Sequence, residues 1–232
     1  MVPVGLKPVF SAEKAHEAQR GLSERIIFQD KVPERIRLIG GVDVAYVEDA
    51  SIAAVAVLDF GSMKLKESQT AICRTRFPYV PTLLAFREIP PAVSCIGRLR
   101  VQPDVFIVDG HGFAHPYRCG FASHLGLVVG KPTIGVAKGI LVGEVERTET
   151  GGDISFMRDK GEVIGAQIVS KHGLKPIFVS VGHMVSLATA IKIVKQCTLL
   201  SRVPEPVLQA HRIAMAEKRK VNISSSAVTS NE

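Results

Sequence analysis

Three acidic residues lie in or beside apolar runs that are far apart in the chain. Asp43 lies within LIGGVDVAYV, Glu88 within TLLAFREI, and Asp109 ends the apolar part of DVFIVDGHG. Placing a carboxylate on a buried element costs free energy unless the group is paired or binds a cation. Hard divalent ions such as Mg²⁺ take oxygen ligands of this kind. We therefore predict one metal site that is assembled from three separate segments.

Each of these carboxylates also has a plainer interpretation. Alternate residues of a strand share a face, so Gly41 and Ala45 would flank Asp43 and leave room for an ion and its waters. A strand aspartate can equally cap a nearby loop, and Asp109 can bond backbone amides within a turn. Glu88, taken alone, is better explained as a solvated helix carboxylate beside an arginine, because ionisable groups mark sites only statistically.

The loop after Asp109 has the composition of a substrate-binding loop. It reads GHGFAHP over residues 110–116. Ligands of α/β sheets collect at the carboxyl ends of strands. Gly110 and Gly112 allow a substrate to approach the backbone closely. His115 can transfer protons or contact a phosphate.

Three further residues suit a nucleic-acid substrate. Lys138, in GVAKG, can hold a scissile phosphate, and a surface lysine is the alternative. His183 is predicted to begin a helix, where N–H groups favour an anion, although a local cap is the commoner role. Tyr79 stands between Pro78 and Pro81, which stiffen it, so its ring can replace a base in a stack. The alternative for Tyr79 is a core tyrosine at a helix start.

The composition is that of a globular protein with an anionic partner. The 232 residues, 46% hydrophobic and 22% charged, suffice for a single α/β domain with a substantial core. The formal charge of +7 favours a polyanion such as nucleic acid. The four cysteines form no CxxC pair, which disfavours zinc and favours buried free thiols in a reducing compartment. Without an apolar run of membrane-spanning length or a secretory leader, we expect a cytoplasmic protein with no membrane partner.

Apolar periodicity predicts the elements that must position these residues. It predicts a helix over 11–29, strands over 35–47, 52–60 and 64–77, a helix over 82–99 interrupted at Pro90 and Pro91, a strand over 105–108, a helix over 118–129 and a strand over 133–136. A hairpin over 154–170, a strand over 177–181, a helix over 183–200, a last helix over 204–220 and a disordered tail over 222–232 follow. Strands that come first, and then alternate with helices, favour a mixed sheet covered on both faces. This order resembles the ribonuclease H-like fold, whose catalytic carboxylates lie on the first strand, the first helix and the end of the fourth strand.

Six motifs resemble those of the endonuclease V family of deoxyinosine 3′-endonucleases. They are GVDVAY (41–46), FPYVPTLLAFRE (77–88), DGHGFAHPYRCGFASHLG (109–126), PTIGVAKG (132–139), VGHMVSLATA (181–190) and RVPEP (202–206). The resemblance extends from about Val32 to Arg212 and implies one catalytic domain over residues 1–221. Two positions depart from the family pattern: Val80 stands where Ile is expected, and Thr82 where Gly is common. Thr82 lies close to the expected base pocket, so this departure bears on base selectivity.

The resemblance implies a catalytic set of Asp43, Glu88, Asp109, Lys138 and His183. The two aspartates would be the principal ligands of Mg²⁺, with Glu88 completing the acidic set, and Mn²⁺ would substitute. Lys138 and His183 would lie near the cleaved backbone, with His115 beside the acidic cluster. Whether one ion or two would bind is left open by the residues.

The resemblance also implies how the substrate is held. A wedge of Tyr79, Val80 and Pro81 would separate the strands at the lesion. The pocket for the flipped hypoxanthine would be lined by Leu84, Gly110, His111 and Gly112, and backbone amides of residues 110–112 would donate to its carbonyl group.

The implied activity is repair of DNA that contains deoxyinosine, by a monomeric enzyme. Hydrolysis would fall at the second phosphodiester bond 3′ to the lesion and leave 3′-hydroxyl and 5′-phosphate ends. One alternative is a ribonuclease that uses the same site on inosine-containing RNA, since nothing in the sequence clearly reads the 2′-hydroxyl. The other is a non-catalytic nucleic-acid-binding protein on this fold, which would require a broken acidic set.

Overall fold

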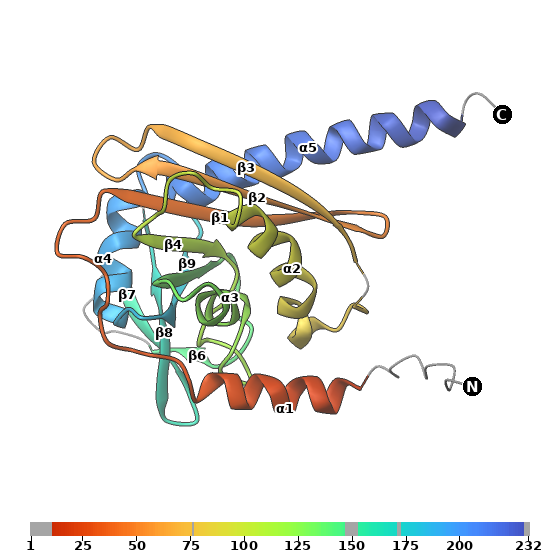
Figure 1. Cartoon of the computed structure of the whole chain (residues 1–232). Coiled ribbons are helices and arrows are strands. Elements are labelled where there is room, and N and C mark those ends of the chain that lie inside the picture. Colours follow the sequence, from red (N-terminus) through yellow and green to blue (C-terminus); the bar gives the residue numbers. More distant parts are fainter. Residues whose placement is uncertain (1–10, 76, 147–152, 171–172, 230–232) are drawn as a thin grey trace.

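A nine-stranded mixed sheet forms the centre of the protein (Figure 1). The computed structural model describes residues 11–75, 77–146, 153–170 and 173–229. Along the sheet the strands are β3 (Leu65–Arg74), β2 (Ala50–Asp59), β1 (Leu38–Val47), β4 (Val105–Asp109), β5 (Thr133–Ala137), β9 (Ile177–His183), β8 (Glu162–Ile168), β7 (Ile154–Asp159) and β6 (Glu144–Val145). The antiparallel meander β1–β3 and the parallel strands β4 and β5 beside it confirm the predicted ribonuclease H-like arrangement.

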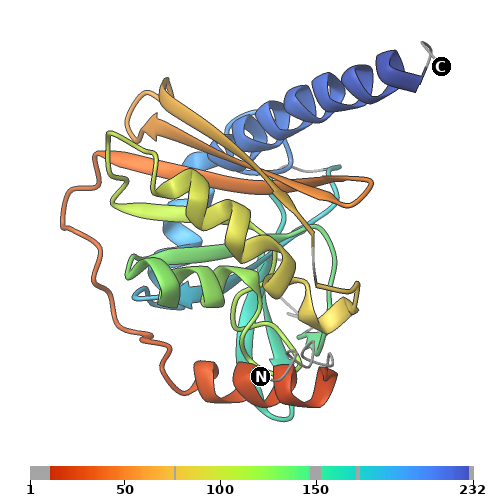
Figure 2. The same ribbon diagram turned by 45° about the vertical axis from the view of Figure 1, so that its right-hand side comes forward.

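Helices cover both faces of this sheet. They are α1 (Ala12–Ser23), the 3-10 helix η1 (Pro81–Leu83), α2 (Ala85–Ile96), α3 (Phe121–Val129), α4 (Leu187–Cys197) and α5 (Glu205–Thr229). Figure 2 shows α2 and α3 together in front of the sheet, whereas the C-terminal half of α5 (blue) projects beyond it. The predicted helices covering a mixed sheet are therefore confirmed.

Alternation along the strands assigns each side chain to one of two apolar cores. In β4, Val105 and Ile107 pack with α4 and α5, whereas Phe106 and Val108 pack with α2 and α3. Successive strand residues point to opposite faces, so the next residue, Asp109, lies on the α5 face. The same alternation in β1 separates Ile39 from Val42, and it places Asp43 on the α5 face too.

Side-chain caps set several helix boundaries. Ser11 accepts a hydrogen bond from the Lys14 N–H at 3.2 Å, which confirms it as the N-cap of α1. Ser186 caps α4 in the same way through the Thr189 N–H. Because Ser186 has extended backbone, the helix predicted from residue 183 begins at Leu187, and His183 is instead the last residue of β9.

Several predicted boundaries differ from the structure. Helix α1 ends at Ser23 rather than at residue 29, and β3 ends at Arg74 rather than at residue 77. The break predicted at Pro90 and Pro91 falls upstream, between η1 and α2, and α2 continues through both prolines. A proline ring removes one helical hydrogen bond without forbidding the helical φ, so packing of α2 on the sheet can retain the helix.

Helix α5 continues further than periodicity predicts. The sequence indicates a helix over residues 204–220 and a disordered tail from residue 222, whereas the structure is helical as far as Thr229. Extending an existing helix needs only one more residue fixed per hydrogen bond, so a packed N-terminal half supports an exposed continuation.

Two compositional expectations can be compared with the fold. All four cysteines are free thiols, and three of them, Cys95, Cys119 and Cys197, are buried. Within the described part of the chain, no helix is both long enough and apolar enough to cross a bilayer.

Candidate metal and nucleic-acid site

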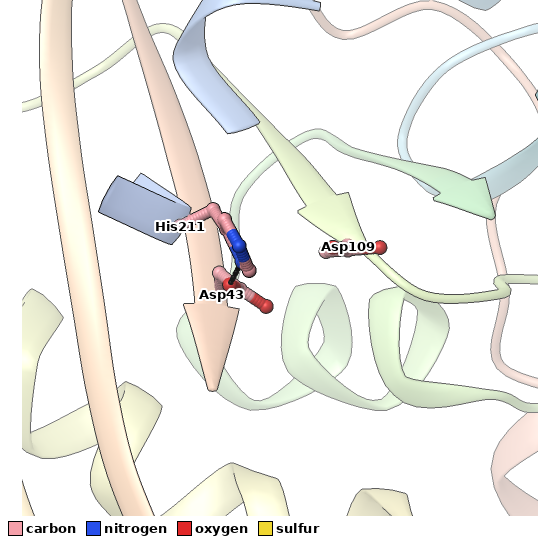
Figure 3. Close-up of side chains that lie close together, drawn as sticks. All are labelled: Asp43, Asp109 and His211. Carbon is pink, nitrogen blue, oxygen red and sulfur yellow. Dashed lines mark hydrogen bonds and ion pairs between the residues drawn. The ribbon is translucent and has the colours of Figure 1, made fainter. Parts of the chain in front are cut away.

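Parallel pairing of β1 with β4 brings the two predicted aspartates together. Val42 lies opposite Val108, so Asp43 and Asp109 follow at the same edge of the sheet. Together with His211 of α5, each offers one ligand atom, and these three atoms all lie within 4.8 Å of one another. Figure 3 shows the three side chains converging from two strands and a helix. The predicted convergence of Asp43 with Asp109 therefore agrees with the structure.

His211 is the site residue that the sequence analysis missed. Its Nδ1 donates to Asp43 Oδ2 at 2.7 Å, while Asp43 Oδ1 accepts from the Val44 N–H at 2.9 Å. The only local signal is a histidine on the helix predicted after RVPEP. Which face of that helix contacts β1 depends on how the helix packs on the sheet, and apolar periodicity within the helix does not predict this packing.

Gly41 allows α5 to lie directly on β1. A Cβ atom at Gly41 would come within 1.9 Å of the Pro206 carbonyl oxygen, at the first turn of α5. The space beside Asp43 that the sequence assigned to an ion and its waters is thus partly filled by the helix. The contact places His211, five residues after Pro206, above the carboxylate.

Lys138 follows β5 and pairs with the second aspartate. Its Nζ lies 2.5 Å from Asp109 Oδ2. Burial raises the pKa of Asp109, and the charge of Asp43 raises it further, while Lys138 acts in the opposite direction. One ammonium group therefore offsets only part of the cost of holding two carboxylates together.

Glu88 is buried beside Asp43 and Asp109 but is not one of the three converging ligands. Asp43, Glu88 and Asp109 are together called the acidic group. The Tyr46 hydroxyl donates to Glu88 Oε1 at 3.1 Å. Burial raises the pKa of Glu88 to about 8 despite this hydrogen bond, and Asp43 and Asp109 add to the shift. The interpretation of Glu88 as a solvated carboxylate is wrong, because its exposed fraction is 6%.

The donor set fits a divalent cation. Two carboxylates and an imidazole offer converging ligand atoms, and the raised pKa values show that this edge of the sheet disfavours uncompensated negative charge. A cation would supply the missing positive charge. Because Mg²⁺ retains several waters, the few protein ligands present are enough to hold it.

A cavity of about 170 Å³ adjoins the acidic group. One wall comes from the segment before and within α2, and the other from the loop between β4 and α3. It is lined by Pro81, Leu84, Ala85, Glu88, Asp109, Gly110, His111, His115, Gly120, Phe121 and Leu141. Because Glu88 and Asp109 line it, the cavity shares residues with the acidic group.

Gly112 does not line the cavity as the sequence predicts. A Cβ atom there would lie 2.1 Å from the Val181 carbonyl oxygen, so this glycine serves the packing of the loop on β9. Its N–H donates to Ser180 Oγ at 2.9 Å, and the Gly110 N–H donates to the Val136 carbonyl at 2.9 Å. Neither amide is therefore available to a ligand in this arrangement.

The segment predicted to form a wedge presents Tyr79 to solvent. Tyr79 is 69% exposed, so the alternative of a core tyrosine is wrong. The guanidinium carbon of Arg87 lies 5.6 Å from the Tyr79 ring centroid and 4.8 Å from that of Tyr46. Arg87 thereby links the exposed ring to the tyrosine that bonds Glu88.

His115 and His183, which the sequence suggests for proton transfer or phosphate contact, have different positions. His115 is buried and lines the cavity, and burial lowers its pKa to about 4. His183 lies opposite Thr133, at the start of β5, whereas Asp109 lies opposite Val136, near the end of that strand. The His183 Nδ1 accepts from the Ile27 N–H at 3.3 Å. The structure therefore does not bring His183 to the carboxylates, and its expected place near the cleaved backbone stays a prediction.

Comparison with known proteins gives one consistent result. The family model for endonuclease V matches residues 20–212. The endonuclease V of Thermofilum pendens is 44% identical over 211 residues, covering 90% of each chain. The crystal structure of Streptomyces avermitilis endonuclease V is similar with a TM-score of 0.86 at 35% identity, covering 92% of this chain and 96% of that one. Ciona intestinalis endonuclease V, in complex with DNA containing an inosine followed by a ribo-adenosine, has a TM-score of 0.83 at 33% identity over 91% of this chain and all of that one.

Proposed function

Because the chain belongs to the endonuclease V family, we propose that it is a repair endonuclease acting on deoxyinosine in DNA. It hydrolyses the second phosphodiester bond 3′ to the lesion and leaves 3′-hydroxyl and 5′-phosphate ends. The observation that carries this proposal is the sharing of Glu88 and Asp109 between the acidic group and the adjoining cavity. A flipped base and a reacting phosphate would thus be held on either side of the same carboxylates.

Asp43, Asp109 and His211 are the residues that would hold the cation. When bound there, Mg²⁺, or Mn²⁺ as a substitute, would supply a lowered pKa for a bound water and compensation of the charge on the leaving oxygen. The His211 imidazole contacts Asp43 Oδ2 through Nδ1 and fixes the orientation of the Asp43 carboxylate. Lys138 places an ammonium group beside Asp109, where it can contact the scissile phosphate. The catalytic set is therefore Asp43, Glu88, Asp109, Lys138 and His211, without His183.

The His111 backbone amide is the donor that we assign to the lesion base. Among the described residues its N–H finds no acceptor, whereas the amides of Gly110 and Gly112 are both engaged. Hypoxanthine carries a carbonyl group where adenine carries an amino group. A fixed N–H group donates to the carbonyl oxygen of hypoxanthine, whereas it meets the hydrogens of the adenine amino group unfavourably. Flipping costs a few kcal/mol and is cheapest at weak pairs, which adds preference for the lesion.

Inosine in RNA is a second candidate substrate. The Ciona relative was crystallised with a ribonucleotide directly after the inosine. That observation favours tolerance of a 2′-hydroxyl on the 3′ side of the lesion. Parallel substrates with deoxyribose or ribose on the 3′ side separate the two activities.

The test is a nicking assay on a labelled duplex that contains a single deoxyinosine. We expect a nick one nucleotide beyond the lesion on its 3′ side in Mg²⁺, and no nick in EDTA or with deoxyadenosine at the same position. Cleavage of inosine-containing RNA alone would replace the proposed substrate. Binding without any cleavage of either substrate would overturn the catalytic assignment.

A further inference from the structure

Helix α1 contacts both walls of the cavity. We define the wedge wall as residues 79–85 and the loop wall as residues 109–121, which between them contribute nearly all of the cavity lining. Within α1 the only fully buried residue is Gln19, whose exposed fraction is 0%. A surface helix normally buries an apolar stripe. The one fully buried side chain of α1 is thus an amide, and its hydrogen bonds contribute to the attachment of the helix.

Gln19 joins the two walls through one atom. Its Nε2 donates to the Thr82 carbonyl at 2.9 Å and to the Cys119 carbonyl at 3.0 Å. An amide nitrogen carries two hydrogens, so each carbonyl receives one. The distance between the wedge wall and the loop wall is thereby fixed at this point by a single planar group.

His16 repeats the bridge one turn earlier in α1. Its Nε2 lies 2.8 Å from Thr82 Oγ1, on the wedge wall. Its ring stacks on Tyr117 of the loop wall, with centroids 4.1 Å apart and planes inclined by 15°. Residues three apart share a helix face, so His16 and Gln19 contact the walls side by side.

Thr82 is the point at which these contacts meet. Its carbonyl accepts from Gln19 and also bonds the ring of His115, which lines the cavity. Its hydroxyl bonds His16. Thr82 stands at a place where a glycine is common in related motifs. A glycine has no hydroxyl and could not make the contact with His16.

We propose that α1 is a clamp that sets the separation of the two walls, with Gln19 and His16 as positioning residues for base selectivity. The proposal rests on the proposed function, because it concerns the cavity that would receive the flipped base. Neither residue lines the cavity. Their effect is to hold Thr82, Cys119 and Tyr117, so that the gap admits a base of one size. Loosening the clamp should therefore change which base is accepted more than it changes cleavage itself.

The first test compares Gln19→Met with Glu17→Met in the full chain. Methionine preserves the length of the glutamine side chain and removes both donors, and Glu17 is an exposed residue of the same helix. Hydrogen exchange of the free protein reports on the walls without substrate. We expect residues 77–85 and 110–121 to exchange about tenfold faster in Gln19→Met, from the loss of buried hydrogen bonds. Exchange there should be unchanged in Glu17→Met, and unchanged exchange in Gln19→Met would overturn the clamp.

The second readout is selectivity in single-turnover nicking. Deoxyxanthosine has a base with one more carbonyl group than hypoxanthine, so a wider cavity should favour it. We expect the rate ratio of deoxyinosine to deoxyxanthosine to fall by about tenfold in Gln19→Met, matching the exchange result. Equal losses on both substrates would show a purely structural role and overturn the proposal. Absence of nicking at deoxyinosine in the wild type would refute the proposed function, while the exchange measurement would still test the clamp.

If the Gln19→Met protein does not fold, two milder variants still test the clamp. Thr82→Val replaces the hydroxyl with a methyl group of similar size, and His16→Phe keeps an aromatic ring on Tyr117. Each removes the same hydrogen bond, so each should lower the selectivity ratio by about threefold, and the double variant should lower it no further. Additive effects in the double variant, or no effect in either, would contradict the bridge through His16.

Discussion

Each of the two site aspartates is already paired before any cation or substrate arrives. His211 bonds one oxygen of Asp43, and Lys138 bonds one oxygen of Asp109. A buried charge that loses its partner is costly, so these pairs allow the acidic group to exist in the folded protein. Lys138 leaves the second oxygen of Asp109 for a cation, while the second oxygen of Asp43 accepts one hydrogen bond from the Val44 N–H and keeps a further lone pair. Local charge balance and cation binding thus use the same residues.

At the residue scale, we predict that Asp43→Ala and Asp109→Ala abolish nicking and retain some DNA binding. Loss of a cation ligand removes several kcal/mol of charge stabilisation, so the rate should fall by at least about 10³-fold. Single-turnover nicking in Mg²⁺ and binding by gel shift measure the two properties separately. Near-normal nicking by either variant would contradict the assignment of the ligands.

Tyr79→Ala should weaken lesion recognition more than cation binding. The exposed ring is held by Arg87 and lies on the wedge wall, outside the acidic group. Loss of stacking on a base is worth about 1–3 kcal/mol, so discrimination between deoxyinosine and deoxyadenosine duplexes should fall by about tenfold or more. Titration of the nicking rate with Mg²⁺ should give an unchanged midpoint. An unchanged preference for deoxyinosine would remove the wedge from the proposal.

At the scale of elements, the sequence of each segment predicts part of the site, and packing between elements determines the rest. The apolar runs around Asp43 and Asp109 predict strands, and parallel pairing then determines that the two carboxylates meet. His211 was not predictable in this way, because its place depends on α5 lying against Gly41. The same limit explains Gly112, where a glycine that resembles a substrate contact is required by the approach of β9. His183 likewise lies in a motif that resembles a catalytic one. Because β9 is antiparallel to β5, His183 lies at the opposite end of β5 from Asp109.

We predict that widening the contact of α5 with β1 weakens nicking, because this contact positions His211. In Gly41→Ala the new methyl group would overlap the Pro206 backbone, so α5 must shift and carry His211 away from Asp43. Overpacking of this kind costs about 1–3 kcal/mol of unfolding free energy, and nicking should fall further than stability alone explains. Denaturant unfolding and nicking at saturating substrate measure the two effects. Gly61→Ala is the matched control, because its Cβ would meet no atom closer than 3.7 Å.

At the scale of the whole molecule, buried histidines make the fold sensitive to acid. Burial lowers the pKa of His115 and of His124 to about 4. Their folded pKa values lie below the unfolded value, so the unfolded state binds more protons. The stability that they contribute is complete above about pH 6.5 and is lost as the pH falls toward 4, on the order of 1–3 kcal/mol for each histidine.

Thermal unfolding across this range tests the acid sensitivity. We expect the unfolding temperature to fall between pH 6.5 and pH 4, and to fall less steeply in His124→Leu. His124 is suited to the test because its Nδ1 is buried without a hydrogen-bond partner among the described residues. An equal slope in His124→Leu and in the wild type would refute this explanation.

The place of His211 in the chain has a consequence for synthesis on the ribosome. The residue bonds Asp43 across 168 positions of sequence, whereas both aspartates and their strands emerge much earlier. Chains emerge from the N-terminus and begin to fold before they are finished. A nascent chain that has reached β5 would possess five of the nine strands and both carboxylates without the imidazole. Truncated translation products that lack α5 should therefore be inert, so that cleavage could begin only after the C-terminal helix has been made.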